Sequence, residues 1–141
     1  MKKTIIIDAS VAAKWLLPDE YDLRADVIKK SFTDREIAVA VSNLIFYEIN
    51  NLLNSAALSK RISVRDSANF YESLLNLDFT IHWSKELLIK TLQKALDLNI
   101  SSYDASYVAL AQSLQIPLYT ADEKLVKKVN SPLVKSLIDY I

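Results

Sequence analysis

The chain has 141 residues and equal numbers of basic and acidic side chains, 17 Lys or Arg and 17 Asp or Glu, with no Gly, no Cys and a single His. The missing Gly excludes Walker loops, Rossmann dinucleotide turns and serine-hydrolase elbows, because each needs a residue without Cβ where the backbone meets phosphate or turns sharply. The missing Cys excludes thiolate nucleophiles and Cys-ligated metals, and one His cannot form a multi-His metal site. Any catalysis must therefore use carboxylates, hydroxyls, Lys or Arg.

The length suits one domain over residues 1–141, large enough to bury about two thirds of the surface that the unfolded chain exposes. No stretch approaches the roughly 18 uncharged apolar residues of a membrane span, and the apolar run at residues 4–7 is too short for a signal peptide. We therefore expect a cytoplasmic protein with no membrane partner. The balanced charge argues against a strongly basic face for nucleic acid, so any such contact needs local clusters of Lys or Arg.

Strands and helices alternate along the whole chain. Strands are predicted where β-branched apolar residues run together or alternate, and helices where apolar residues recur every three or four positions. In chain order, the sequence predicts a strand at residues 4–7, helices at 10–17 and 21–32, a strand at 37–41, helices at 42–58 and 63–77, a strand at 79–83, helices at 84–98 and 101–115, a strand at 117–121, a helix at 122–129 and a strand at 132–137. This alternation predicts an α/β fold, a three-layer α/β/α domain whose central, mainly parallel sheet has about five strands.

Polar residues mark the predicted helix ends. Ser42, Ser63 and Ser101 stand at N-terminal positions where a hydroxyl accepts a free backbone N–H. Asn99 and Asn130 stand where Gly usually ends a helix in the left-handed conformation, which Asn tolerates best after Gly. We expect both Asn residues to adopt a positive φ.

Two aspartates directly follow predicted strands. Asp8 comes after the first strand and Asp122 after the fourth, so both belong to the carboxyl edge of the sheet, where open α/β sheets bind ligands. Each has an ordinary alternative role as the N-cap of the following helix. Ser10 and Thr120 each stand two residues from one of these aspartates, and we expect their hydroxyls to orient the carboxylates or a metal-bound water.

Two further carboxylates interrupt apolar helix faces. In the helix at 42–58, apolar residues occupy the inward stripe except at Glu48, which is therefore expected to point at the sheet. The alternative is that Glu48 lies at the margin of the stripe and reaches solvent. Asp104 shares a face with Val108 and Ala111, although an Asp in a first helical turn also complements the helix dipole as part of an ordinary cap.

Together, Asp8, Glu48, Asp104 and Asp122 are expected to converge above the sheet. Four like charges in one cleft require a cation, and the all-oxygen donor set selects Mg²⁺ or Mn²⁺ over zinc. Such an ion suits phosphoryl chemistry, because it neutralises charge on phosphate oxygens and lowers the pKa of a bound water that attacks phosphorus. Lys14, close to Asp8 in the sequence, is the candidate for contact with a substrate phosphate.

Four motifs resemble those of a known family. They are similar, in order and spacing, to the motifs of PIN-domain nucleases, most closely the VapC-like toxins of type II toxin–antitoxin modules: IIDAS at 6–10, YEIN at 47–50, YDASYVALA at 103–111 and YTADEKL at 119–125. The resemblance implies a Mg²⁺- or Mn²⁺-dependent endoribonuclease that cleaves RNA, forms a homodimer and binds a small cognate antitoxin through its acidic cleft. It maps the acidic residues and hydroxyls of the family onto Asp8, Glu48, Asp104, Asp122, Ser10 and Thr120. One departure is Gln115, where the family commonly has Gly before the strand of the fourth motif.

Several apolar and aromatic residues have more than one interpretation. Residues 15–17, with apolar residues of the helix at 21–32, either form an exposed groove for an antitoxin helix or pack on the first strand. Tyr103 and Tyr107 are interpreted as core or dimer contacts rather than as base-stacking residues. His82 is expected to be a solvated or helix-covered structural residue.

The sequence disfavours two other phosphoryl-transfer functions and leaves two alternatives to a toxin nuclease. An aspartyl-phosphate phosphatase needs a second Asp two residues after Asp8, where Ser10 stands, and a phospho-receiver domain needs its acceptor Asp after the third strand, where the chain has His82 and Trp83. A catalytically silent PIN-like subunit that only binds a partner is the alternative from a different class. A solitary RNA-processing PIN nuclease is the alternative within the same class.

Overall fold

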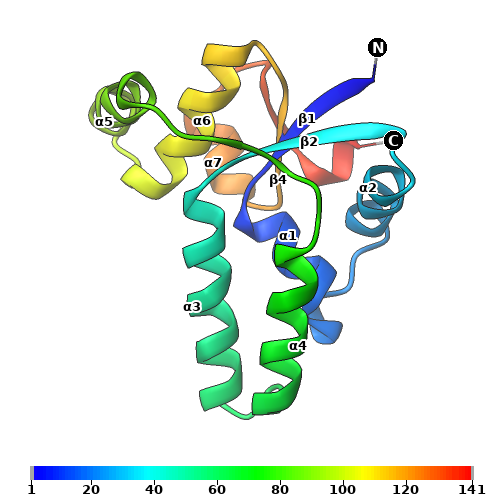
Figure 1. Ribbon diagram of the computed structural model, residues 1–141. Coiled ribbons are helices and arrows are strands. Elements are labelled where there is room, and N and C mark those ends of the chain that lie inside the picture. The colour runs from blue at the N-terminus through cyan, green and yellow to red at the C-terminus, as the bar shows by residue number, and fades with distance from the viewer. Residues whose placement is uncertain (1, 141) are drawn as a thin grey trace.

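The structure, a computed structural model, describes residues 2–140. The order of its elements matches the predicted alternation (Figure 1). They are β1 (Lys3–Ile7), α1 (Ala9–Leu16), the 3-10 helix η1 (Pro18–Glu20), α2 (Leu23–Thr33), β2 (Ile37–Ser42), α3 (Leu44–Leu58), α4 (Val64–Leu75), β3 (Thr80–His82), α5 (Lys85–Leu98), α6 (Ser102–Leu114), β4 (Leu118–Thr120), α7 (Glu123–Val129), β5 (Val134–Ser136) and the 3-10 helix η2 (Leu137–Asp139). Among these residues, no helix is both long and apolar enough to cross a membrane.

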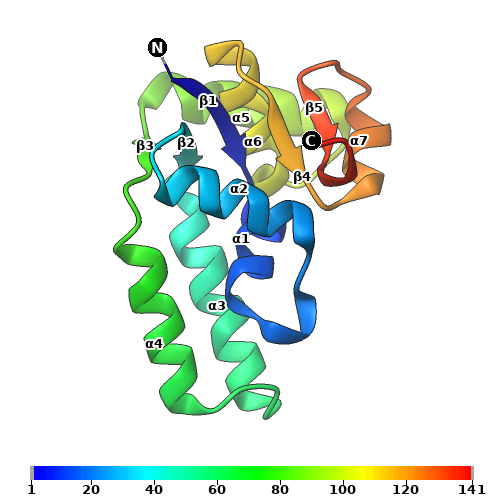
Figure 2. The same cartoon turned by 90° about the vertical axis from the view of Figure 1, so that its right-hand side faces the viewer.

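The strands form one five-stranded parallel sheet in the order β3-β2-β1-β4-β5. Ile6 of β1 is paired with Ala40 of β2 on one side and with Leu118 of β4 on the other. In Figure 2, α2 lies in front of the sheet, and α5 and α6 lie behind it. The predicted three-layer α/β/α class is therefore confirmed.

Helices α3 and α4 form a hairpin that projects beyond the carboxyl ends of the strands (Figures 1 and 2). The hydroxyl of Tyr71 on α4 donates a hydrogen bond to the carbonyl oxygen of Phe46 on α3 at 2.7 Å and ties the two helices together. At the start of α3, Ser42 is the last residue of β2 and its Oγ accepts the N–H of Leu44 at 3.3 Å. The predicted helix start is thus two residues early.

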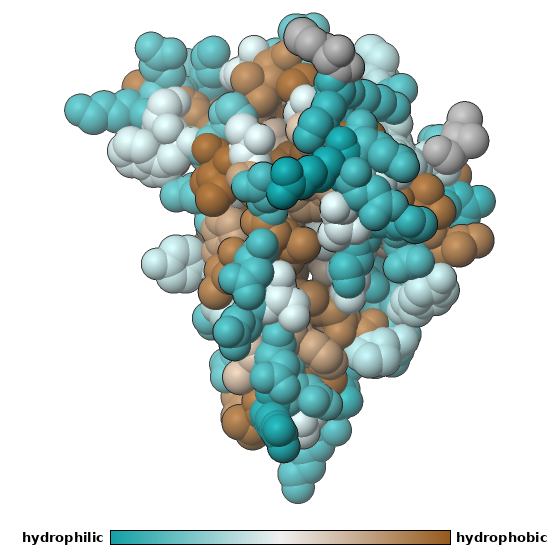
Figure 3. All heavy atoms as spheres, turned by 45° about the vertical axis from the view of Figure 1, so that its right-hand side comes forward, coloured by the Kyte–Doolittle hydropathy of each residue, from teal (hydrophilic) through white to brown (hydrophobic). Residues whose placement is uncertain are grey.

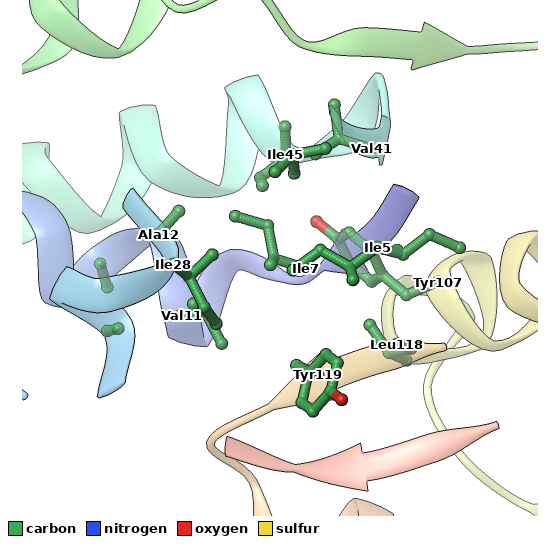
Figure 4. Close-up of a cluster of buried hydrophobic side chains, with 14 of the residues drawn as sticks. Ile5, Ile7, Val11, Ala12, Ile28, Val41, Ile45, Tyr107, Leu118 and Tyr119 are labelled. Carbon is green, nitrogen blue, oxygen red and sulfur yellow. The ribbon is translucent and has the colours of Figure 1, made fainter. Parts of the chain in front are cut away.

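The core is built around β1, the central strand. Ile5, Ile6 and Ile7 are fully buried because helices cover both faces of the sheet (Figure 4). Tyr107 of α6 belongs to the same cluster, as expected, whereas Tyr103 is 62% exposed and is not part of the core.

The predicted groove does not include residues 15–17, because Leu16 and Leu17 belong to the core cluster that contains β1, as the packing alternative predicts. Leu17 is 1% exposed, and Leu16 is buried as well. The indole N–H of Trp15 donates to the carbonyl oxygen of Ala25 at 2.7 Å, and its ring stacks on Phe79 with centroids 6.2 Å apart. Helix α2 covers this segment, so it offers no free surface to a partner helix. The apolar residues of the segment 21–32 do include exposed ones: Tyr21 is 62%, Leu23 66% and Val27 40% exposed.

Edge strand β3 is shorter than predicted. Phe79 is buried, but Ile81 and Trp83 are 54% and 61% exposed, so the alternation of apolar residues there does not correspond to a buried face. His82 is half-buried beside Leu87 of α5 and Leu110 of α6, which confirms the helix-covered interpretation. Figure 3 shows other apolar side chains at the surface, between polar ones.

Within residues 2–140, five residues adopt a positive φ, all at chain reversals. The two predicted ones are confirmed, with φ of 50° at Asn99 and 49° at Asn130. Gln115 ends α6 with φ of 55°, and Arg35 and Lys60 have φ of 62° and 63°. A residue with Cβ in this region is strained by about 1 kcal/mol or more, because Cβ crowds the following carbonyl oxygen.

Candidate active site

Asp8 directly follows β1 and is the N-cap of α1. It is 5% exposed. Its Oδ1 accepts hydrogen bonds from the Ser10 N–H at 3.1 Å and the Ser10 hydroxyl at 2.5 Å, and its Oδ2 accepts one from the Thr120 hydroxyl at 2.6 Å. The N-cap role and the expected contacts with both hydroxyls are therefore compatible, because one oxygen caps the helix and the other is held by β4.

Ser10 and Thr120 also join the loops that follow β1 and β4. Each hydroxyl donates its one hydrogen to Asp8. The Ser10 hydroxyl also accepts the backbone N–H of Ala121, from the segment after β4, at 2.9 Å, whereas the Thr120 hydroxyl accepts the N–H of Asp122 in its own segment at 3.1 Å. This network fixes the two predicted strand-end aspartates relative to each other.

Glu48 lies on α3 and faces inward, as the interrupted apolar stripe predicts. It is half-buried, and the hydroxyl of Tyr107 on α6 donates a short hydrogen bond to its Oε1. Burial raises the pKa of Glu48, the hydrogen bond from Tyr107 lowers it, and the charges of Asp8 and Asp104 raise it further. The alternative placement of Glu48 in solvent is therefore wrong.

Asp104 is half-buried in the first turn of α6. Its backbone N–H donates to the hydroxyl of Ser101 at 3.0 Å, so the ordinary cap also exists here. Burial raises the pKa of the Asp104 carboxyl, and the charge of Asp122 raises it further. The carboxylate is thus more than a helix-dipole partner, since it carries the repulsion of a second acidic residue.

Asp122 is exposed and is the N-cap of α7. Its Oδ1 accepts the backbone N–H groups of Lys124 at 3.0 Å and Leu125 at 3.2 Å. Its predicted cap role is therefore real, and its charge still acts on Asp104.

Like charges act on one another among the four carboxylates, and no ion pair neutralises them within residues 2–140. The pKa of Asp8 is raised, first by burial and also by the charge of Asp104, although hydrogen bonds partly oppose the rise. The charges of Asp8 and Asp104 likewise raise the pKa of Glu48, and the charge of Asp122 raises the pKa of Asp104. The site is therefore acidic, and like charges act on one another within it.

A cleft of about 390 Å³ opens beside this network. Its lining includes Ser10, Lys14, Glu48 and Asp122. Lys14, the candidate for contact with a substrate phosphate, lies in the lining of this cleft. Glu20 of η1 also lines the cleft and accepts a hydrogen bond from the guanidinium of Arg61 at 3.1 Å, as part of an exposed ion pair. No sequence pattern marks Glu20, because a short 3-10 turn brings it there.

The donor chemistry of the site suits a hard divalent cation, because carboxylate and hydroxyl oxygens surround it. Within residues 2–140, however, no three His, Asp or Glu side chains are arranged closely enough to hold a metal ion. Asp8 is turned to Ser10 and Thr120, and Glu48 to Tyr107, so the carboxylates are neighbours without being converged on one point.

Comparison with known proteins agrees with this architecture. The chain matches the family described as PIN domain over residues 5–130. It is 34% identical over 97 residues to Ribonuclease VapC1 of Mycobacterium tuberculosis, which covers 68% of this chain and 71% of that protein. The crystal structure of PAE2754 from Pyrobaculum aerophilum superposes with a TM-score of 0.73 at 24% identity, over 98% of this chain and 93% of that one. A toxin–antitoxin complex from Klebsiella pneumoniae superposes with a TM-score of 0.66 at 15% identity, over 94% and 97%.

The chain therefore belongs to the PIN-domain family. Its relatives include proteins named VapC, which confirms the resemblance found in its four motifs.

Proposed function

We propose that the protein is a metal-dependent endoribonuclease in which Asp8, Glu48, Asp104 and Asp122 hold Mg²⁺ or Mn²⁺. The observation that carries this proposal is geometric: the hydroxyls of Ser10 and Thr120 hold the Asp8 carboxylate at the ends of β1 and β4, and Glu48 and Asp122 line the adjoining cleft. Burial and like charges also raise the pKa of Asp8, Glu48 and Asp104. Residues whose pKa values are shifted by burial and by specific charged neighbours gather at functional sites. The family and the name of the relative Ribonuclease VapC1 support RNA as the substrate.

The residues of the cleft have separate roles in this proposal. A divalent ion bound there would neutralise charge on the scissile phosphate and lower the pKa of an attacking water. Ser10 and Thr120 hold the Asp8 carboxylate in place through both of its oxygens. Lys14 projects into the cleft, where its ammonium group would attract a phosphate of the RNA backbone.

A cleavage assay with a matched control tests this function. We expect the purified protein to cut single-stranded RNA in Mg²⁺ or Mn²⁺ and to stop in EDTA, and we expect Asp8→Asn to be inactive. Asp22→Asn is the control, since Asp22 is the N-cap of α2 and accepts two backbone N–H groups as Asp8 does. Full cleavage in EDTA, or equal activity of both variants, would sink the proposal.

We also propose that the protein is the toxin of a type II toxin–antitoxin pair, acting in the cytoplasm as a homodimer with a small cognate antitoxin. The fold shared with a toxin–antitoxin complex of Klebsiella pneumoniae supports an antitoxin partner. A short adjacent reading frame that encodes a small DNA-binding protein, and growth arrest relieved by its co-expression, are the expected results. Lack of both would point to a solitary RNA-processing nuclease. Light scattering of the purified protein should give the mass of a dimer, and the mass of a monomer would contradict the proposed homodimer.

A further inference from the structure

Tyr107 combines a buried position with a polar end. It is 1% exposed, and its ring packs among the isoleucines of β1 (Figure 4). A buried phenol hydroxyl needs a hydrogen-bond partner, because leaving it unpaired costs roughly 1–3 kcal/mol. Within residues 2–140, the hydrogen bond that this hydroxyl makes goes to Oε1 of Glu48. A phenylalanine would fill the same core space, so the hydroxyl serves the contact with Glu48.

The bond crosses from one helix to another at the acidic end of the sheet. Tyr107 lies three residues after Asp104 on α6, so the two side chains share a helix face. Glu48 approaches from α3, and the charges of Asp8 and Asp104 act on it. The Tyr107 hydroxyl therefore contacts the Glu48 carboxylate where the charges of other acidic groups also act on it.

Repulsion from Asp8 and Asp104 favours rotation of the Glu48 side chain away from them. A half-buried carboxylate with two like charges nearby gains solvation by rotating to water. The hydrogen bond from Tyr107 opposes that rotation and occupies only Oε1, and no hydrogen bond within residues 2–140 reaches Oε2. One oxygen of Glu48 is thus held by the protein, and the other is left for a ligand.

We propose that Tyr107 is a positioning residue that holds Glu48 beside Asp8 and Asp104 with Oε2 free for a divalent cation. This inference rests on the proposed metal-dependent function, and it assigns to a core residue a role that its burial alone does not reveal. Partners that orient a metal ligand typically change metal affinity by about 10–100-fold when they are removed.

Binding of Mn²⁺ alone, measured by calorimetry without RNA, tests the role. We expect Tyr107→Phe to bind Mn²⁺ about 10–100-fold more weakly than the parent protein. Tyr71→Phe is the control, because it also removes one phenol hydrogen bond, the one between α4 and α3, and lies outside the acidic site. Its Mn²⁺ affinity should match that of the parent. Unchanged affinity in Tyr107→Phe would overturn the inference and leave the proposed function intact, whereas a parent protein that binds no Mn²⁺ would overturn both.

A second measurement needs no metal. Crystal structures of the parent and of Tyr107→Phe, both in EDTA, should show Glu48 rotated toward solvent in the variant only. A Glu48 side chain in the same place in both crystals would overturn the positioning role, whatever the calorimetry shows. In RNA cleavage at limiting Mn²⁺, we expect Tyr107→Phe to be slower than the parent, and saturating Mn²⁺ should bring its rate closer to that of the parent, with KM for RNA unchanged because the substrate contacts are intact.

Discussion

Asp66 and Asp104 occupy equivalent positions in two helices with different surroundings. Each lies three residues after a Ser N-cap, and each backbone N–H donates to that Ser hydroxyl at 3.0 Å. Asp66 is exposed on α4. Asp104 is half-buried on α6, where burial and the charge of Asp122 raise the pKa of its carboxyl. Replacing each residue by Asn therefore separates an ordinary capping role from charge repulsion at the candidate site.

The magnitude follows from what each variant loses. Both Asp66→Asn and Asp104→Asn lose the interaction of a carboxylate with the helix dipole, about 0.3–1 kcal/mol. Only Asp104→Asn also relieves repulsion from acidic neighbours. Because Asp104 is half exposed and solvent screens its charge, this relief is about 1–2 kcal/mol at low salt. Asp104→Asn should thus be about 1–2 kcal/mol more stable than Asp66→Asn, which corresponds to roughly 3–8 °C in Tm.

The assay is thermal unfolding followed by circular dichroism at pH 7, in EDTA and at low ionic strength. Adding salt should shrink the difference between the two variants, since salt screens exposed and partly exposed charges. Adding Mn²⁺ should stabilise the parent more than Asp104→Asn, because an ion that binds only the folded state raises Tm. Equal Tm values for Asp66→Asn and Asp104→Asn in EDTA would refute the view that the site is destabilised by its own charge.

Three further predictions concern pH, a helix end and the support of Asp8. Because the pKa values of Asp8, Glu48 and Asp104 are raised, the folded state holds protons at pH values where the unfolded state has released them. The free energy of unfolding should therefore be greatest below the unfolded pKa values of about 4 and should fall as pH rises. Unfolding in EDTA at increasing pH measures this, and a free energy of unfolding that rose steadily with pH would contradict it. Gln115→Gly should raise the free energy of unfolding in urea by about 0.5–1 kcal/mol, because Gly adopts a φ of 55° without strain, and no gain would disprove strain at that turn. Thr120→Val should lower stability by about 1–3 kcal/mol and reduce RNA cleavage, since Oδ2 of Asp8 loses its hydrogen bond, and unchanged activity would argue against that contact as a support of the site.

Much of the fold could be predicted because its local signals agree with its tertiary structure. The run of isoleucines in β1 is buried on both faces, as a central parallel strand requires. Asn99 and Asn130 also marked their helix ends correctly, since the left-handed conformation is a local property. Arg35 and Lys60 were missed because neither residue type signals a positive φ, and in a chain without Gly such positions carry no visible mark.

The site was only partly visible in the sequence for a similar reason. Periodicity identified Glu48 as an inward carboxylate, but it could not show that Tyr107, 59 residues away in the sequence, donates a hydrogen bond to it. The groove expected at residues 15–17 failed because α2 covers Trp15, which is a tertiary contact. Glu20 reached the cleft through a short 3-10 turn that has no periodic pattern.

The hydrogen bonds around Asp8 have a consequence for ligand capture. No buried side-chain nitrogen or oxygen among residues 2–140 lacks a partner, and Asp8 is held by two hydroxyls and by backbone N–H groups of α1. Its rotamer is therefore fixed during folding, and the entropy of ordering it does not oppose later binding. Such preorganisation of Asp8 favours capture of a small ligand, because this side chain does not have to be ordered when the ligand arrives.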